Sequence, residues 1–259
     1  MQNLFDLTGK IAVITGGSRG IGEMIAEGFV ANGVKTYISS RKAEACDATA
    51  ERLSEQGECI SIPADLSTSE GVQSLANEIK SRESRLDILV NNAGATWGAS
   101  IEEFPESGWD KVMDINVKGP FFLTQALLPL LEASATPEDP ARIINVGSID
   151  GINVNQLGTY SYGPSKAAIH HLTRTLASHL ADRNITANAI APGPFPSKMT
   201  AGIAKAMGEK IREGVPLKRW GEPADMAGTA IFLAAKASAY ISGAVIPVDG
   251  GIVGSSRTL

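Results

Sequence analysis

The chain has 259 residues, a length that suits one α/β domain with a sizeable hydrophobic core. Hydrophobic residues make up 43% and charged residues 20%, as in ordinary globular proteins, and no apolar run reaches the length of a membrane span. The formal net charge of −5 argues against a nucleic-acid surface, and the N-terminus lacks the apolar stretch of a signal peptide, so we expect a cytoplasmic protein.

The first predicted strand, residues 10–15, leads directly into a glycine-rich turn with the spacing G-xxx-G-x-G. An apolar helix follows and ends near residues 32–33. A strand, a glycine turn and a helix in this order form a phosphate cradle, because the backbone comes close to the ligand and the helix N-terminus favours anions. The residues expected to hold a nucleotide here are Gly16, Ser18, Arg19, Gly20, Ile21 and Gly22.

The second predicted strand, residues 34–39, is followed by Ser40, Arg41 and Lys42. Folds that bind NAD place an acidic residue after this strand to hold the ribose 2′-hydroxyl, and none occurs here. The guanidinium groups of Arg19 and Arg41 match a 2′-phosphate, whereas Lys42 fits a plain surface role. The sequence therefore favours NADP(H) over NAD(H), with Ser40 and Arg41 at the phosphate.

Helices are expected over residues 43–55 and 69–83, and strands over 58–63 and 86–90. Asp65 and Leu66 follow the third strand, at the edge where open α/β sheets bind ligands. The Asp65 carboxylate either accepts a hydrogen bond from an adenine amino group or caps the next helix. After the fourth strand, Asn92, Ala93 and Gly94 let the backbone lie against a flat ligand, although the Asn side chains can equally pin neighbouring strands.

The middle of the chain supplies two further polar candidates. Asn116 lies inside a long apolar helix predicted over residues 107–134, where a buried Asn usually satisfies backbone groups. Ser148 follows the fifth strand, residues 141–146, and can hydrogen-bond a substrate carbonyl. It is not expected to be a nucleophile, because no His–Asp partner pattern accompanies it.

Tyr162 and Lys166 are four residues apart at the start of a predicted helix, so their side chains share one face. Tyr160 would face elsewhere. A phenol titrates at a pKa of about 10 when unperturbed. A nearby ammonium group is expected to lower that pKa and to make Tyr162 an acid–base catalyst. By itself this spacing is typical of a solvated pair on a helix, and the rest of the chain favours the catalytic interpretation.

The last third begins with a strand over residues 184–191, followed by a proline-rich elbow and a segment, 197–219, that has the pattern of a mobile amphipathic lid. Its cations favour a solvated face over a site for an acidic carrier protein or coenzyme A. A helix over 223–236 and a strand over 244–248 complete the sheet, with a turn at 249–251. The lid cations are Lys205, Lys210, Arg212, Lys218 and Arg219.

Cysteine and histidine give no metal-binding pattern. Cys46 and Cys59 are the two cysteines, and we expect both to be reduced and unpaired. His170, His171 and His179 fall on the helix after Tyr162 and are expected at the surface or at an interface. No metal site is predicted.

The motifs TGGSRGIG at 15–22 and NNAG at 91–94, with Ser148 and Tyr162-xxx-Lys166, resemble those of the short-chain dehydrogenase/reductase family over nearly the whole chain. The stretches GWDKVMDINV, YGPSKAA and IAPGPFPSKMT are similar to those of bacterial 3-oxoacyl thioester reductases, including the rhamnolipid-pathway type. The resemblance implies a homotetramer, with the helices around 107–134 and 160–182 at an interface. It also implies that Asn116 holds a water in a proton relay to Lys166, and that the nicotinamide lies beside the elbow residues Pro192, Gly193, Phe195 and Ser197.

We therefore expect a single domain over 1–259 with a doubly wound, Rossmann-type parallel sheet of seven strands flanked by helices, and a lid at about 193–220. The expected reaction is NADPH-dependent reduction of a 3-oxoacyl group carried on acyl carrier protein or CoA. Trp97, Phe195 and the lid methionines favour an acyl chain, whereas Asn153, Asn155 and Gln156 keep a sugar, a steroid or another small alcohol open. A catalytically retired nucleotide-binding protein is a third possibility. No nucleic-acid or membrane partner is expected.

Overall fold

Seven parallel strands form one sheet in the order β3-β2-β1-β4-β5-β6-β7. The computed structural model describes residues 3–155, 157–197 and 201–255. The strand order runs outward in both directions from β1 and β4, which places a topological switch point between these two strands. The predicted doubly wound parallel sheet is confirmed.

The strands are β1 (Ile11–Thr15), β2 (Lys35–Ser39), β3 (Cys59–Ser61), β4 (Ile88–Asn91), β5 (Ala141–Val146), β6 (Ile185–Pro192) and β7 (Val245–Val248). The α-helices are α1 (Gly20–Ala31), α2 (Ala43–Ser54), α3 (Ser69–Arg82), α4 (Glu106–Met113), α5 (Gly119–Ser134), α6 (Tyr162–His179), α7 (Ala201–Gly214) and α8 (Pro223–Ala234). Short turns of helix are η1 (Asp114–Lys118), η2 (Ile149–Gly151), η3 (Ala181–Arg183) and η4 (Lys236–Ser238).

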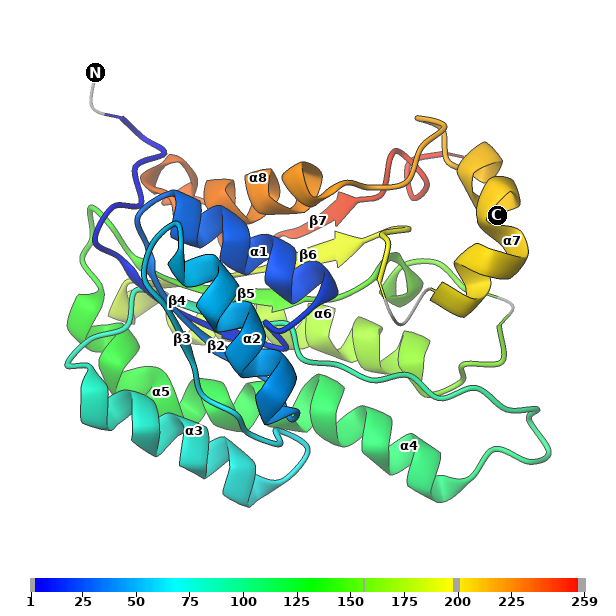
Figure 1. Ribbon diagram of the computed structural model, residues 1–259, viewed down its shortest axis with the longest axis horizontal. Helices are drawn as coiled ribbons and strands as arrows, with labels where there is room; N and C mark the ends of the chain where they lie inside the picture. Colours follow the sequence, from blue (N-terminus) through cyan, green and yellow to red (C-terminus); the bar gives the residue numbers. More distant parts are fainter. Residues whose placement is uncertain (1–2, 156, 198–200, 256–259) are drawn as a thin grey trace.

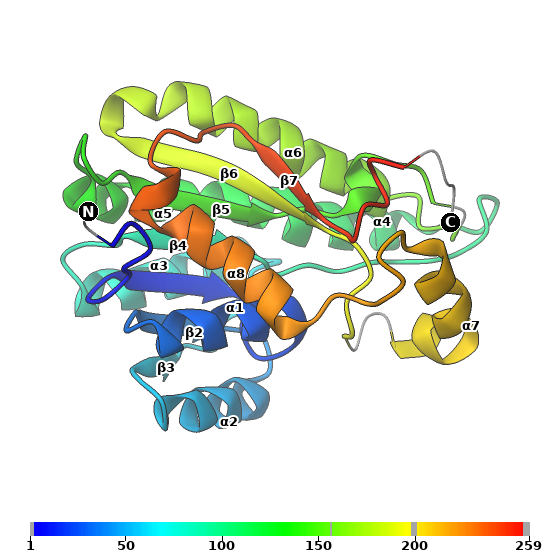
Figure 2. The same ribbon diagram turned by 90° about the horizontal axis from the view of Figure 1, so that it is seen from above.

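Two helical layers cover the sheet (Figures 1 and 2). Helices α1, α2 and α8 pack on one face, and α3, α5 and α6 pack on the other. Successive residues of β1 show why: Ala12 and Ile14 join the first core, whereas Val13 joins the second. The central strands are therefore apolar on both sides, as parallel sheets require.

The segment predicted as one helix over residues 107–134 runs continuously but changes its winding. Helix α4 passes into the π-helical turn η1, and α5 continues from Gly119. A π-helical turn inserts one extra residue and often marks a functional site. This one holds Asn116.

Helix α7 lies away from both covering layers, beside the carboxyl ends of β6 and β7 (Figures 1 and 2). The glycine turn, η2, the start of α6 and the lid segment all converge at the carboxyl ends of the strands. This end of the sheet is called its carboxyl edge.

Candidate active site

The glycine turn and the segment after β4 meet at the switch point of the sheet. Thr15 Oγ1 accepts hydrogen bonds from the backbone N–H groups of Asn92 and Ala93 at 2.9 and 3.0 Å. Asn92 Nδ2 donates to the carbonyl oxygens of Thr15 and Gly16 at 2.8 and 3.2 Å. The prediction that an Asn here pins neighbouring strands is confirmed. Gly16 has a φ of +67°, and a Cβ there would lie 2.7 Å from Asn92 Nδ2, so only glycine fits.

The turn leaves the N-terminus of α1 open to a ligand. Arg19 is the N-cap residue, and its side chain makes no capping hydrogen bond. Gly20 faces Ser197 across the cradle, since a Cβ on Gly20 would lie 3.4 Å from Ser197 Cβ. An uncapped helix N-terminus surrounded by small residues is a good fit for a phosphate group.

The end of β2 is suited to a second anionic group. Ser40 is half-buried, Arg41 and Arg19 are exposed, and no acidic residue lies between β2 and α2. A hydrogen bond from Ser67 lowers the pKa of the Asp65 carboxyl, and the positive charge of Arg41 lowers it further. These residues fit a dinucleotide that carries a 2′-phosphate.

Of the two roles that the sequence left open for Asp65, the capping of α3 is wrong. The N-cap of this helix is Thr68, whose Oγ1 accepts a hydrogen bond from Gly71 N at 3.0 Å. Asp65 Oδ1 instead accepts bonds from the backbone N–H and the hydroxyl of Ser67 at 3.1 and 2.7 Å. Because Thr68 directly precedes α3, its hydroxyl reaches the open N–H of Gly71, whereas Asp65 lies three residues earlier and shapes the preceding turn.

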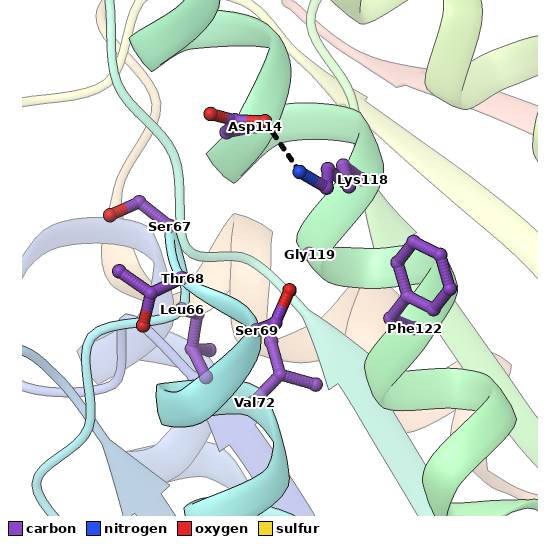
Figure 3. Close-up of a pocket in the computed structure, with 9 residues that line it drawn as sticks. All are labelled: Leu66, Ser67, Thr68, Ser69, Val72, Asp114, Lys118, Gly119 and Phe122. Carbon is purple, nitrogen blue, oxygen red and sulfur yellow. Dashed lines mark ion pairs between the residues drawn. The ribbon is translucent and has the colours of Figure 1, made fainter.

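Leu66, which was expected at the nucleotide, lines a hollow between the start of α3 and the η1–α5 junction (Figure 3). Asp114 and Lys118 form an ion pair of 3.3 Å across its rim. The hollow encloses about 10 Å³, which is room for a single water molecule and no more. It is too small to be a ligand site of its own.

Asn116 is 2% exposed and joins three segments. Its Oδ1 accepts a hydrogen bond from Ala95 N at 2.8 Å, and its Nδ2 donates to Ala95 O at 3.0 Å and to Ser165 Oγ at 2.9 Å. A Cβ on Gly94 would lie 3.1 Å from Asn116 Oδ1 and 3.6 Å from Lys166 Nζ. The π-helical turn thus places the amide beside Gly94 and Lys166, and the predicted backbone-satisfying role of Asn116 is confirmed.

Ser148, Tyr162 and Lys166 come together at the carboxyl edge. Ser148 is 8% exposed and makes a side-chain hydrogen bond with Tyr162. Helix α6 begins at Tyr162, and Lys166 Nζ lies 5.6 Å from the centre of the Tyr162 ring, as the four-residue spacing predicted. Lys166 is 5% exposed and donates to Val146 O at 2.9 Å. Tyr160 is exposed and points to the Phe104 ring instead.

The expected lowering of the Tyr162 pKa is wrong. Burial raises the pKa of Tyr162 to about 12, and the Ser148 hydrogen bond opposes that shift only in part. Burial likewise lowers the pKa of Lys166 to about 8. Spacing along a helix specified the proximity of these groups, but the depth at which the helix starts could not be read from it.

His170 differs from the expected surface histidine. It is 3% exposed, and a Cβ on Gly147 would lie 2.0 Å from its Nε2. A hydrogen bond to the Gly151 backbone holds the ring, while burial lowers the pKa of His170 to about 4. His171 and His179 are exposed, as expected. Because His170 is one turn beyond the buried Lys166, its burial follows from the buried face of α6.

The elbow after β6 lies against the end of β7. Gly193 N donates to Val248 O at 2.9 Å, and a Cβ on Gly193 would lie 2.7 Å from Asp249 Cα. Phe195 is 3% exposed and its ring packs on Gly221, so its side chain is not available to an acyl chain or a nicotinamide. Pro192 and Gly193 therefore present backbone to the crevice.

Trp97 also departs from the acyl-chain expectation. Its indole packs against Gly108 at the start of α4, and Lys111 Nζ lies 5.1 Å from its ring centre. The lid residue Met207 is 42% exposed, at a kink inside α7. Met199 and Gln156 lie outside the described residues.

Several lid cations have acidic or carbonyl partners. Arg212 pairs with Glu209, Arg219 forms an ion pair with Asp225, and Lys218 Nζ donates to Glu213 O. These contacts agree with the predicted solvated face. Within residues 3–155, 157–197 and 201–255, no three His, Cys, Asp or Glu side chains are grouped to hold a metal ion. Over the same residues, no helix combines the length and the apolar character needed to cross a membrane.

Two residues of the site escaped the sequence reasoning. Asp150 follows Ser148 by two positions, and its backbone N–H donates to Ser148 Oγ at 3.1 Å. Ser165 Oγ accepts from Asn116 and donates to Tyr162 O at 2.7 Å. Their adjacency to Ser148 and Lys166 was the available signal, but nothing in their residue types distinguished them from ordinary turn and helix residues.

Comparison with known proteins gives a consistent picture. Residues 16–253 match the family model described as enoyl-(acyl carrier protein) reductase. A rhamnolipids biosynthesis 3-oxoacyl-[acyl-carrier-protein] reductase of Pseudomonas aeruginosa is 52% identical over 97% of this chain and 99% of its own length. A short-chain dehydrogenase/reductase of Diaporthe leptostromiformis is 34% identical over 96% of this chain and 93% of its own.

The solved structures agree. A Pseudomonas aeruginosa protein, solved as an active-site complex with NADP, superposes with a TM-score of 0.94 at 52% identity, covering 98% of this chain and all of that one. Both the sequence likeness and the structural likeness extend over the sheet, the glycine turn and the Tyr162–Lys166 helix. The chain belongs to the short-chain dehydrogenase/reductase family.

Proposed function

We propose that this protein is an NADPH-dependent reductase that converts a 3-oxoacyl thioester, carried on acyl carrier protein or CoA, to the secondary alcohol. The observation that carries the proposal is the convergence of Ser148, Tyr162 and Lys166 at the carboxyl edge of the sheet, beside the glycine turn. The 52% identity to a 3-oxoacyl-[acyl-carrier-protein] reductase over almost the full length supports the substrate class.

The chain would hold NADPH along the crevice at the switch point. The open N-terminus of α1 would receive the pyrophosphate, with Gly16, Ser18, Gly20, Ile21 and Gly22 around it. Ser40, Arg19 and Arg41 would receive the 2′-phosphate. Asp65, Leu66, Asn92, Ala93 and Gly94 would lie along the adenosine and ribose. Pro192, Gly193 and Ser197 would lie along the nicotinamide, and Phe195 would contribute its backbone there, because its side chain packs on Gly221. NADPH bound here supplies the hydride that reduces the carbonyl carbon.

Each polar side chain of the site has a distinct task in this reaction. Ser148 orients the carbonyl and donates to the oxygen as negative charge develops. Tyr162 donates its proton to that oxygen as general acid. Lys166 places a positive charge next to the phenol and binds the nicotinamide ribose. Asn116 holds the water through which the proton is replaced.

The raised pKa of Tyr162 fits the reductive direction. A general acid must carry its proton at working pH, and a phenol with a pKa of about 12 does so throughout the neutral range. The developing alkoxide is a stronger base than a phenolate, so proton transfer from Tyr162 remains favourable. The same pKa hinders Tyr162 as a base for alcohol oxidation.

Exposed apolar side chains near the site support an acyl substrate. Ile152, Val154 and Leu157 lie on the loop between Ser148 and Tyr162 and are 44%, 86% and 52% exposed. Apolar groups on a loop next to a reacting centre are suited to contact a hydrocarbon chain. The amide of Asn155, which would favour a sugar, is engaged with Asp150 and with the loop itself.

The proposal is tested by measuring NADPH oxidation with 3-oxoacyl thioesters of acyl carrier protein and of CoA, and with keto-sugars and steroid ketones. We expect kcat/KM to be highest for the thioesters. Faster turnover of a keto-sugar or a steroid would assign the protein to that substrate class. An absence of turnover with every ketone, despite NADPH binding, would identify a retired nucleotide-binding protein.

The cofactor preference is tested with Arg41→Ala. Because a charged hydrogen bond to the 2′-phosphate is lost, KM for NADPH should rise about tenfold while KM for NADH stays the same. Lys42→Ala is the matched control and should change neither value. Equal effects of Arg41→Ala on both nucleotides would contradict the placement of Arg41.

The assembly and its location complete the proposal. We expect a homotetramer whose interfaces include α4, α5 and α6, supported by Trp109, Phe121 and Phe122, which are 42%, 38% and 41% exposed in the isolated chain. Sedimentation velocity measures this directly. We also place the protein in the cytoplasm, where the unpaired Cys46 and Cys59 remain reduced.

A further inference from the structure

Asp150 occupies a central position between the reacting groups and the loop that follows them. It lies in the short helical turn η2, immediately before Gly151, where a Cβ would approach Lys166 C within 2.6 Å. On the other side, a Cβ on Gly163 would lie 3.2 Å from Asp150 O. The backbone of Asp150 is thus in close contact with the first turns of α6, which carry Tyr162 and Lys166.

Within the described residues, one side chain holds the Asp150 carboxylate by a hydrogen bond. Asn155 Nδ2 donates to Asp150 Oδ2 at 2.8 Å. The Asn155 Oδ1 accepts from Leu157 N at 2.9 Å and from Thr159 Oγ1 at 3.3 Å. Through this amide, the carboxylate of Asp150 is connected to the loop that exposes Val154 and Leu157.

The charges around the site make Asp150 the counter-charge of Lys166. Burial raises the pKa of Asp150, and the Lys166 ammonium opposes that shift. The Asp150 carboxylate in turn opposes the burial that lowers the pKa of Lys166. In the described part of the chain, Lys166 forms no ion pair within 4.0 Å, so Asp150 acts on it through space.

Among the described residues, Asp150 is the charged group that shifts the pKa of Lys166. Tyr162 and His170 share α6 with Lys166, and both are neutral near pH 7. Asp114 and Lys118 on η1 pair with each other. The remaining charged groups on elements packed against α6 are Glu106, Asp110 and Lys111 on α4, Arg174 on α6, Asp182 and Arg183 on η3, and Arg142 on β5.

We propose that Asp150 is a positioning residue with two roles. Its carboxylate keeps the buried Lys166 ammonium charged during catalysis. Its hydrogen bond to Asn155 couples Ser148 to the loop between Ser148 and Tyr162, which is expected to contact the substrate. This inference rests on the proposed roles of Tyr162 and Lys166. The Asp150 side chain therefore provides both a negative charge and a hydrogen bond that tethers the loop, and different substitutions remove the two.

Asp150→Asn removes the charge and keeps an oxygen that accepts from Asn155. The alkaline limb of the kcat/KM–pH profile should then move to lower pH by roughly one unit. At pH values above the limb, kcat/KM should fall about tenfold relative to the unmodified enzyme. The Asp150 charge also raises the pKa of Tyr162, and its loss moves the limb in the same direction. Asp150→Ser provides a second charge-free variant if Asp150→Asn does not fold.

Asn155→Ala removes the tether and keeps the charge. It should leave the alkaline limb in place and raise KM for the thioester about threefold to tenfold. Asp182→Asn, an exposed substitution on η3 just after the end of α6, controls for the change in net charge and should alter neither quantity. Identical pH profiles for Asp150→Asn and the unmodified enzyme would overturn the proposal.

A second readout needs neither cofactor nor substrate. In protein with ¹³C-labelled lysine, the Lys166 signal is identified by its loss in Lys166→Arg, and its NMR titration midpoint should fall in Asp150→Asn but not in Asn155→Ala. An unchanged midpoint would refute the charge role. A shifted midpoint in a protein that reduces no ketone would support Asp150 and refute the proposed function, so the two failures are distinguishable.

Discussion

A charged side chain is buried at both ends of the strands, but the partners of that charge differ between the two ends. At the amino ends of the strands, Lys10 Nζ lies 2.7 Å from Asp139 Oδ2, and Arg142 Nη2 lies 3.1 Å from Asp139 Oδ1. Arg142 is 1% exposed and also donates to the carbonyl oxygens of Pro140 and Ala235. Ala235 is the C-cap residue of α8, where a cation complements the helix dipole. This charge is matched on several sides.

At the carboxyl ends, Lys166 is nearly as buried but has a single carbonyl oxygen as its hydrogen-bond partner in the described residues. An unpaired buried ammonium group costs stability, and burial accordingly lowers the pKa of Lys166 to about 8. The comparison teaches that a buried charge with a close counter-ion and carbonyl partners, such as the Nη atoms of Arg142, belongs to the architecture. Buried charge without a close counter-ion is kept for a reaction.

The largest expected effect comes from Tyr162→Phe. Loss of the proton donor should reduce turnover by about 10²–10⁴-fold, because general acid catalysis contributes that much. NADPH affinity, followed by fluorescence titration, should stay within about twofold, since the phenyl ring fills the same space. A loss of turnover below about tenfold would remove Tyr162 from the reaction.

The role of the buried charge at the amino ends of the strands is tested with Arg142→Met. The variant keeps the buried volume but leaves the carbonyl oxygens of Pro140 and Ala235 without this donor, so unfolding should become easier by about 2 kcal/mol. The melting temperature, measured by calorimetry, should fall by about 5 °C for a chain of this length. The kcat should not change. A variant that melts normally would show that the Arg142 network does not stabilise the fold.

The smallest expected change in melting temperature comes from Lys166→Met, and this change is an increase. At pH 7 this variant should melt about 3 °C higher, because an unpaired buried cation is removed, although its turnover is lost. The folded-state pKa of Lys166, about 8, lies below the ordinary 10.5. The cost of burying the charge is therefore fully present below pH 8 and is relieved as the pH rises toward 10.5.

The melting-temperature difference between Lys166→Met and the unmodified protein should accordingly shrink from pH 8 to pH 10. Calorimetry across that range measures it. If Lys166→Met melts lower than the unmodified protein at pH 7, the two edges of the sheet do not differ in the way described here.

Much of the fold could be predicted because its signals are local. Continuous apolar runs such as residues 11–14 specify strands buried on both faces, and glycine turns specify where a strand becomes a helix. The proximity of Tyr162 and Lys166 also follows from local geometry, since four residues make about one helical turn. These features depend on neighbours along the chain.

Other properties of the site depend on depth and on contacts between distant segments. The π-helical turn that aims Asn116 at Ala95 and the packing of Phe195 on Gly221 have no local signature. Asp65 shows the same limit at short range. The sequence left open that Asp65 caps α3, and the path of the chain after β3 gave that position to Thr68 instead.

The sequence by itself determined the family, the order of strands and helices, and which residues converge at the carboxyl edge, because these follow from hydrophobic periodicity, turn residues and helical spacing. Only the tertiary structure decided the electrostatics of the site. How far Tyr162 and Lys166 are removed from water, and which carboxylate shifts their pKa values, depends on the packing of β5, η2 and α6 against one another. Burial sets the energy of a charge, and burial is a property of the whole fold.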